Sequence, residues 1–326
     1  MTPGRTSEPV RSSDTLEPTK AERRRAERTA ANETGIWYPR GYWKRFAAPG
    51  TLWMLLFFLV PFYVIVSVAF GTVDPVFRSP LPVYQPWWWT FDAAAEAVGK
   101  IFGPFRETYI RTFTFVVVAS GICLVLGYAV AYYVARFGGR RRTLFLILLI
   151  SPFWISYLMR MLAWRSLLTE DGYINGILSG IGLPVVGWLE GKPVTVILGL
   201  VYGYIPYMIL PLYGFLDRID GALLEAGRDL GANPRQTFWK VTLPLSKPAI
   251  AAALVIVSLP MFGDYYTNNM LSNSPRTTMI GNILDDSVNT SGQGPEAAVF
   301  TLVLMVMLLI PMLYYLRSTA KELARR

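Results

Sequence analysis

The segment IDGALLEAGRDLGANPRQTFWKVTLP, residues Ile219–Pro244, separates two long apolar stretches of this chain. Asp220 can accept hydrogen bonds from the free amides of a first helical turn, so we expect it to be the N-cap of a short helix. Gly231 is expected to end that helix with a positive φ. Asn233-Pro234 is typical of a new helix start, with Asn as the cap and Pro as the first helical residue. The pattern predicts two short helices joined by a turn, the second closed by Leu243-Pro244.

Six apolar stretches, two of them bordering this segment, are candidates for membrane spans. A bilayer core about 30 Å thick needs about 20 helical residues, and four of the stretches clearly reach that length. The sequence therefore predicts an all-α polytopic membrane protein with six transmembrane helices. We expect them at Leu52–Phe70, Thr112–Ala135, Thr143–Met159 (continuing towards Trp164), Pro193–Leu216, Pro248–Gly263 and Ala297–Leu316.

The composition disfavours a soluble enzyme. Only 16% of the residues are charged and 53% are hydrophobic, whereas a soluble domain carries roughly 25% charged residues. The chain has no His and a single Cys, Cys123. The commonest general base is therefore missing, and neither an intramolecular disulfide nor a Cys-based metal site can form. We expect no catalytic residues, no metal and no cofactor.

The net charge of +9 is explained by membrane topology. Sixteen Lys and Arg residues flank one set of span ends and seven flank the other. Because cytoplasmic flanks are enriched in Lys and Arg, both termini are expected in the cytoplasm. The basic residues thus indicate contact with membrane lipid and give no reason to expect a nucleic acid partner.

Glu225-Ala226-Gly227, followed after three residues by Gly231 and after nine more by Val241-Thr-Leu-Pro244, resembles the EAA loop. That loop marks the membrane subunits of bacterial ATP-binding-cassette (ABC) importers. Gly227 replaces the third small residue of the family pattern, and Val241 replaces its usual Ile. A wider resemblance, over about Thr51–Leu316, is to the first permease of spermidine/putrescine importers, the PotB type. It is carried by Ser151–Arg160, Ala163-Trp164, Gly172–Asn175 and Leu223–Ala232.

This resemblance implies a type I ABC importer permease (MetI-like) fold in a bacterial inner membrane. It implies three kinds of partner besides lipid: a second, PotC-like permease, two ATP-binding subunits and an extracytoplasmic solute-binding protein. The EAA loop would be the coupling helix that docks on the ATPase. Carried onto this chain, the docking residues are Leu224, Glu225, Ala226, Gly227, Leu230 and Gly231. ATP hydrolysis would lie in a separate subunit, because this chain has no Walker A motif.

The predicted spans and the family resemblance together predict the domain organisation. Residues 1–36 are polar, with too few apolar side chains for a core, and are expected to be a disordered cytoplasmic tail. Residues 37–108 would form the first transmembrane helix and an external loop. Residues 109–318 would form the importer core, including coupling loop 219–244, and residues 319–326 a cytoplasmic tail.

The resemblance makes a polyamine the first substrate hypothesis. A long cation favours carboxylates and aromatic faces, and Asp264 with Tyr265 after the fifth span fits that need. Tyr204 and Tyr207 share one face of the fourth span, and Trp154 and Tyr157 form a similar pair in the third. Packing between helices is an equally simple explanation of both pairs.

Arg160 is the residue that argues against a cationic substrate. A charge in mid-helix costs about 2.5–3.5 kcal/mol on insertion scales, so it should be paired or near water. In the transport pathway it would suit an anionic or zwitterionic ligand. Its match to the polyamine permeases suggests instead a structural pairing with a carboxylate of the outer face.

Two alternatives stay open at this point. The same architecture could import an opine or another amino-acid-derived solute. A secondary transporter or channel working without an ATPase belongs to a different class, and it would have no partner at the loop 219–244.

Overall fold

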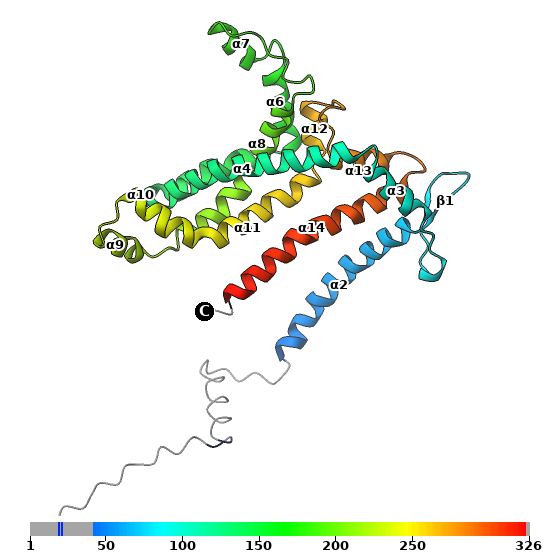
Figure 1. Ribbon diagram of the computed structural model, residues 1–326, viewed down its shortest axis with the longest axis horizontal. Coiled ribbons are helices and arrows are strands. Elements are labelled where there is room, and N and C mark those ends of the chain that lie inside the picture. The colour runs from blue at the N-terminus through cyan, green and yellow to red at the C-terminus, as the bar shows by residue number, and fades with distance from the viewer. Residues whose placement is uncertain (1–18, 20, 22–41, 324–326) are drawn as a thin grey trace, which may run out of the picture. The chain divides into compact units, whose positions relative to one another are not determined.

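The computed structural model describes Thr19, Ala21 and residues 42–323 (Figure 1). The predicted tail 1–36, apart from Thr19 and Ala21, lies outside the described residues, and so do the last three residues of the predicted C-terminal tail. The chain divides into two compact units, residues 1–61 and 62–326. The first long helix, α2 (Tyr42–Ala69), contains the boundary between them.

Five helices of the described residues are long and apolar enough to cross a membrane. They agree with five of the six predicted spans, because each apolar stretch leaves its backbone polar groups no partner in lipid other than the helix itself. They are α2, α4 (Arg106–Phe137), α8 (Pro193–Leu216), the continuous helix Pro234–Phe262 and α14 (Gly294–Leu323).

The third predicted span is not one straight helix. Its residues form η2 (Gly139–Arg141), α5 (Arg142–Ile150), η3 (Ser151–Trp154) and α6 (Tyr157–Leu168). The chain bends by 87° between Trp154 and Tyr157. Ile155 and Ser156 are extended, with ψ of 141° and 140°, so the helical hydrogen bonds cannot continue through them. The bend makes Tyr157 the first residue of a new helix. The helical segments before and after the bend count as a sixth span only if they are taken together.

Leu243-Pro244 does not close the second loop helix, which corrects the expectation from sequence. After α10 (Pro234–Thr237) the chain makes the π-helical turn η4 (Phe238–Thr242) and continues directly as α11 (Leu243–Phe262). Pro244 falls in the first turn of α11, where its missing N–H and its ring are tolerated. The loop is therefore joined rigidly to the fifth span.

The segment between α2 and α4 contains a feature that the all-helical prediction lacked. Strands β1 (Thr72–Val73) and β2 (Pro80–Leu81) pair antiparallel, and η1 (Pro86–Trp88) and α3 (Asp92–Phe102) follow. Trp87 and Trp88 are exposed, whereas Trp89 Nε1 donates to the Val83 carbonyl at 2.8 Å.

The core of the larger unit lies between α4, α8 and α11 (Figure 1). Close approach of α4 and α8 depends on Gly127, where a Cβ would lie 2.8 Å from Met208 Cγ. The buried apolar side chains at this junction include Ala119, Cys123, Leu200, Leu212, Ala253 and Val257. These three helices form the bundle to which the remaining elements attach.

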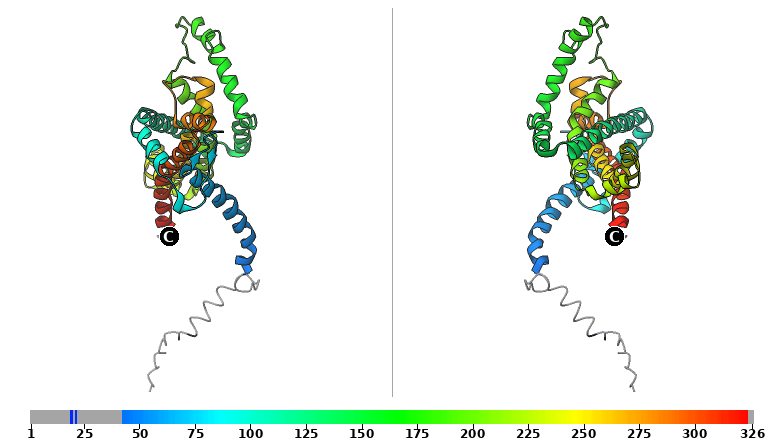
Figure 2. Two further views of the ribbon diagram at one scale, coloured as in Figure 1. Left: turned by 90° about the vertical axis from the view of Figure 1, so that its right-hand side faces the viewer. Right: turned by 90° about the vertical axis from the view of Figure 1, so that its left-hand side faces the viewer.

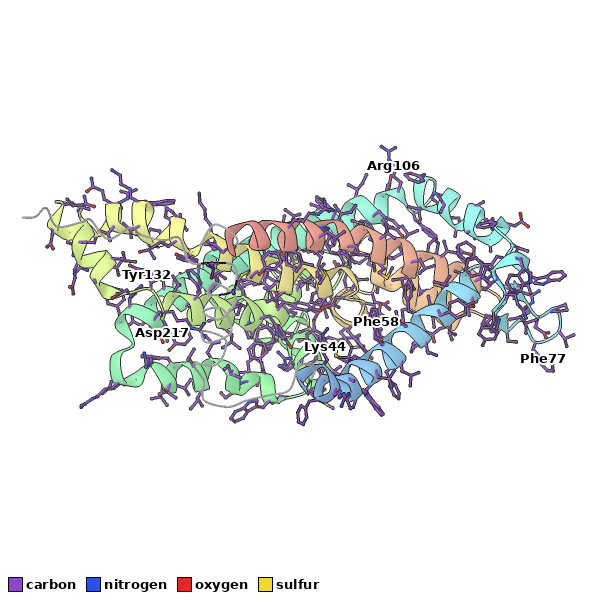
Figure 3. All side chains as sticks on the ribbon, turned by 90° about the horizontal axis from the view of Figure 1, so that it is seen from below. Lys44, Phe58, Phe77, Arg106, Tyr132 and Asp217 are labelled. Carbon is purple, nitrogen blue, oxygen red and sulfur yellow. The ribbon has the colours of Figure 1, made fainter. Side chains whose placement is uncertain are left out.

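The two ends of this bundle carry different elements. At one end lie α9 (Gly221–Asp229) and α10, and at the other α12 (Tyr266–Leu271) and α13 (Ile280–Asn289) (Figure 1). Figure 3 shows Tyr132 and Asp217 at the α9 end and Arg106 at the opposite end. Figure 2 shows α6 leading away from the bundle towards α7 (Tyr173–Gly180).

Candidate functional site

The turn of the predicted coupling loop is built by local capping, as the sequence indicates. Asp220 Oδ1 accepts from the Ala222 amide at 3.0 Å and caps α9. Gly231 has φ of +82°. Its amide donates to the Arg228 carbonyl at 2.8 Å, and the Ala232 amide donates to the Gly227 carbonyl at 3.1 Å. These two bonds define a Schellman motif, which requires the left-handed residue that Gly supplies most easily.

The second loop helix begins with a capping box. Asn233 Oδ1 accepts from the Gln236 amide at 2.8 Å, and Gln236 Oε1 accepts from the Asn233 amide at 3.0 Å. Pro234 occupies the first turn, where no N–H is needed. The predicted cap residues of both helices are thus confirmed, and the angle between α9 and α10 is fixed by hydrogen bonds within a few residues.

The predicted docking residues lie on an open face of α9. Leu230 is 90% exposed, and Glu225 and Ala226 are also exposed. Leu224 and Gly227 are half-buried. Within residues 42–323 no basic side chain forms an ion pair with Glu225.

Gly227 is the point where α9 packs on the helix that follows. A Cβ at this position would lie 3.7 Å from Val241 Cγ2 and 3.8 Å from Thr237 Cγ2, which are ordinary contact distances. An alanine, the usual residue of the family pattern, therefore fits here without displacement.

Two contacts connect the loop to the bundle. Arg136 Nη1, near the end of α4, donates to the Ile219 carbonyl at 3.3 Å. Arg142 Nη1, at the start of α5, lies 3.0 Å from Asp217 Oδ1. These contacts join the chain just before α9 to α4 and α5.

At the other end of the bundle, Asp264 is the centre of a hydrogen-bond cluster. It is 7% exposed. Its Oδ2 accepts from Tyr157 Oη at 3.1 Å, from Tyr204 Oη at 3.1 Å and from Thr267 Oγ1 at 2.7 Å. Its Oδ1 accepts from the Thr267 amide at 2.9 Å. Four donors compensate the burial of this carboxylate.

Asp264, Tyr157 and Tyr204 line a cavity of about 340 Å³. Five of the six predicted pathway residues border it, namely Tyr157, Tyr204, Tyr207, Asp264 and Tyr265. Trp154 does not, because it precedes the bend before α6, and its side chain is 77% exposed. The structure thus brings together residues that the sequence places on α6, α8 and the turn after α11.

Two glycines make this convergence possible. A Cβ at Gly203 would lie 2.8 Å from Tyr157 Cε2, so Gly leaves the room that the tyrosine ring needs in its present position against α8. A Cβ at Gly281 would lie 2.7 Å from the Gly263 carbonyl oxygen and 2.8 Å from the Asp264 carbonyl carbon. The backbone of α13 therefore supports the turn that carries Asp264 from behind.

The expected pairing of Arg160 with a carboxylate is wrong. In the described part of the chain no Asp or Glu lies within ion-pair distance of it. Its guanidinium carbon lies 4.4 Å from the centroid of the Phe153 ring, 5.3 Å from that of Tyr157 and 5.8 Å from that of Tyr202. Aromatic faces take the place of the anion, and Arg160 borders the cavity.

The cavity is also bordered by Arg160, Gly203, Pro260, Gly263 and Tyr266, which were not predicted as pathway residues. Thr267 was not predicted either; it bonds to Asp264 without bordering the cavity. Thr267 had a local signal, since an aspartate followed three residues later by a helix's first amides is a capping pattern. Gly203 had no such signal in the sequence, because its role depends on the Tyr157 ring from another helix. No group of three His, Cys, Asp or Glu side chains suited to a metal occurs among the described residues.

Six apolar segments, a capped polar helix pair at one end of the bundle and a polar cavity at the other are the architecture of an importer permease. The comparisons agree: residues 123–318 match the family described as binding-protein-dependent transport system inner membrane component. The chain belongs to this family. It is a multi-pass inner-membrane permease of an ABC importer, and it works with another permease, a separate ATPase and a periplasmic binding protein.

Relatives and solved structures give the same result. The chain is 31% identical over 270 residues to the spermidine/putrescine transport system permease protein PotB of Salmonella typhimurium, covering 82% of this chain and 90% of that one. It is 32% identical over 274 residues to the inner membrane ABC transporter permease protein YdcU of Escherichia coli, covering 77% and 86%. A chain of the bacterial alginate ABC transporter shares the fold, with a TM-score of 0.67 at 18% identity over 85% of this chain and 93% of that one.

Proposed function

We propose that this chain forms half of the translocation pathway of a polyamine importer, for a spermidine- or putrescine-like cation delivered by the extracytoplasmic binding protein. The observation that carries the proposal is the cavity in which Asp264 is surrounded by Tyr157, Tyr204, Tyr207 and Tyr265. The relatives named for spermidine and putrescine transport support the same choice.

The chemistry of the cavity suits an organic amine. An ammonium over an aromatic face gains about 0.5–2 kcal/mol, depending on how far it is desolvated. Asp264 supplies a negative charge at the end of the cavity, and its attraction is screened less there than at an open surface. The ring centroids of Tyr157 and Tyr204 lie 6.5 Å apart and those of Tyr204 and Tyr207 lie 6.3 Å apart, so the cavity offers several aromatic faces to one cationic ligand.

The loop 219–244 would be the coupling element of this importer. Glu225 would meet a basic residue of the ATPase, Ala226 and Gly227 would allow close approach, and Leu224 and Leu230 would be covered by it. Gly231 would hold the turn. With both termini in the cytoplasm, α9 faces the ATP-binding subunits and the Asp264 cavity lies towards the external face.

The same assignment gives the parts of the chain their roles. Residues 109–318 would be the importer core, preceded by a first transmembrane helix with its external loop over 37–108. The terminal segments 1–36 and 319–326 would be cytoplasmic. The second permease would be PotC-like, and the pathway would run between the two permeases.

The test is transport by the complete complex in proteoliposomes with its binding protein. Spermidine or putrescine should stimulate ATP hydrolysis and accumulate inside, and omission of the binding protein should abolish both effects. If both polyamines are inert while an opine or another amino-acid-derived solute stimulates ATP hydrolysis, the polyamine assignment is wrong. Purification of an active transporter without any ATPase subunit would contradict the coupling role of α9.

A further inference from the structure

A second cavity, of about 570 Å³, lies where the end of α2 meets the start of α14. Its apolar wall comes from these two helices and includes Val64, Ile65, Val68, Ala297 and Ala298. Its polar rim comes from the β1–β2 hairpin and from the segment between α13 and α14, and includes Arg78, Ser79, Asn289, Thr290 and Ser291. An apolar wall below a polar rim suits an amphiphile.

The position of this cavity along the spans matches the edge of a bilayer. Both α2 and α14 are long and apolar enough to cross a membrane. The wall residues 64–68 lie just before the end of α2 at Ala69, and 297–301 lie just after the start of α14 at Gly294. The head-group region extends about 5–7 Å beyond the hydrocarbon core on each side. The wall therefore lies at the end of the hydrocarbon core and the rim among the head groups.

Arg78 gives the rim a positive charge without a partner. It is the one charged side chain among the described residues that border the cavity, and no Asp or Glu of residues 42–323 forms an ion pair with it. The acidic residue nearest to it in sequence is Asp74, whose Oδ1 accepts from the amides of Val76 and Phe77 at 2.8 Å each. A guanidinium matches the oxygens of a phosphate in charge and geometry. The rim is therefore complementary to an anionic head group.

The hairpin turn holds Arg78 at the rim. Its amide donates to the Asp74 carbonyl at 3.0 Å, and its φ is +50°. Its stem lies against Gly292, where a Cβ would be 3.8 Å from Arg78 Cδ. Pro80 packs so closely on α14 that a Cβ at Gly294 would lie 2.7 Å from Pro80 Cβ. Because the site is built before any ligand arrives, binding does not require a loop to become ordered.

An exposed aromatic residue borders the same cavity. Phe77 is 81% exposed and lies at the hairpin end of the molecule in Figure 3. Val288, at the end of α13, also borders the cavity and is 67% exposed. Water would leave these apolar side chains uncovered, whereas lipid would cover them. A soluble phosphate would fill the rim alone, so the occupant that fits both parts is a lipid.

We propose that this cavity binds one anionic glycerophospholipid, with its phosphate on Arg78 and the upper part of an acyl chain against α2 and α14. The hydroxyl groups of Ser79 and Ser291 border the cavity and can donate to other oxygens of the head group. The lipid would link the hairpin and the end of α2 to α14. The inference requires only that the chain spans a membrane and does not depend on which solute is transported.

Photolabelling of the assembled complex in dodecyl maltoside tests the site. The probe is phosphatidylglycerol with a diazirine in one acyl chain, and the labelled peptides are identified by mass spectrometry. In the wild type the label should lie in residues 62–70 and 294–301. Arg78→Gln should reduce this labelling about tenfold or more, as expected for loss of a charge-assisted contact. Arg106→Gln is the matched control and should leave it unchanged, because Arg106 is exposed and does not border the cavity.

Competition in the wild type separates the sources of binding. Unlabelled phosphatidylglycerol should suppress the labelling, diacylglycerol with the same chains should do so at least about tenfold less well, and glycerol phosphate should have no effect. Equal labelling of wild type and Arg78→Gln, or equal competition by diacylglycerol, would overturn the phosphate site. Equal competition by glycerol phosphate would show a soluble ligand. Absence of label from both segments in the assembled complex would show that another subunit covers the cavity, which also overturns the proposal. The competition decides the matter even if Arg78→Gln does not assemble.

Discussion

Tyr157 Oη lies 3.1 Å from Asp264 Oδ2 and joins segments that are 107 positions apart in the chain. Tyr204 Oη makes a contact of the same length to the same oxygen. A single carboxylate oxygen thus connects α6, α8 and the turn between α11 and α12. Any change at Asp264 should therefore be felt both in ligand binding and in the packing of these elements.

Asp264→Asn should weaken cation uptake more than it weakens assembly. The amide removes the negative charge and replaces one acceptor with a donor, which leaves at least one buried hydroxyl or amide without its bond, at about 1–3 kcal/mol. Uptake by proteoliposomes and the yield of assembled complex measure the two effects. Asp286→Asn is the control, because Asp286 is an exposed carboxylate on α13. An unchanged apparent affinity in Asp264→Asn would remove this residue from the pathway.

The sequence indicated Tyr157, Tyr204 and Asp264 as candidate residues, but it could not predict that their side chains contact one another. The pair Tyr204 and Tyr207 follows from helical spacing within one helix. The contact of Tyr157 with Asp264, in contrast, depends on the 87° bend before Tyr157. Hydropathy is continuous through that bend, and the nearest local signal, Pro152 in η3, lies before it and does not give its angle. Trp154 was misplaced for the same reason, because it lies on the other side of the bend.

The coupling loop was predictable in more detail because its geometry is local. Asp220, Gly231 and Asn233 each act on residues two or three positions away, and all three take the predicted conformations. The end of the second helix was not predictable from Pro244 alone. Proline does not by itself end a helix, as Pro206 and Pro211 inside α8 show, and Pro244 follows directly on the π turn that precedes α11.

Glu225→Ala should leave membrane insertion intact and uncouple ATP hydrolysis from transport. The side chain is exposed and forms no ion pair among the described residues, so its removal has little effect on this chain's own stability. Gly231→Pro should uncouple as well, because proline cannot adopt the φ of +82° that the turn requires. Ligand-stimulated ATPase activity and uptake, measured on the same preparation, separate coupling from expression. Normal transport by either variant would contradict the docking assignment.

Gly227→Ala is the matched control on the same helix. The new methyl group would make ordinary contacts with Val241 and Thr237. Replacing a helical glycine by alanine stabilises the helix by about 0.5–1 kcal/mol. Transport should stay close to that of the wild type, with an unfolding temperature equal or slightly higher. A loss of coupling as large as that of Glu225→Ala would show that α9 is sensitive to any change.

Gly281→Ala and Gly203→Ala should have different effects. At Gly281 the methyl group would meet the backbone of Gly263 and Asp264, which cannot yield, so we expect about 1–3 kcal/mol of destabilisation. At Gly203 it would meet the ring of Tyr157, which can turn away and lose its bond to Asp264. Thermal unfolding should therefore report the first variant more strongly, and ligand affinity the second. Gly214→Ala on α8 serves as the control, since nothing lies within 4 Å of its Cβ position. Equal unfolding temperatures for Gly281→Ala and Gly214→Ala would contradict the tight contact.

The contact between α3 and α14 should stabilise the segment between α2 and α4 at neutral pH and lose this effect in strong alkali. Lys100 Nζ lies 2.7 Å from Glu296 Oε2 and 3.1 Å from Glu96 Oε1. The hydrogen bond to Glu296 raises the pKa of Lys100 above its ordinary 10.5. A raised folded-state pKa means that the stabilisation is complete below the unfolded pKa and disappears as the pH rises through the folded value. Lys100→Met should therefore lower stability by about 0.2–1 kcal/mol at pH 8 and by less at pH 11, as for other partly exposed ion pairs. Thermal unfolding of both proteins at the two pH values measures this difference, and a gap that grows with pH would contradict the assignment.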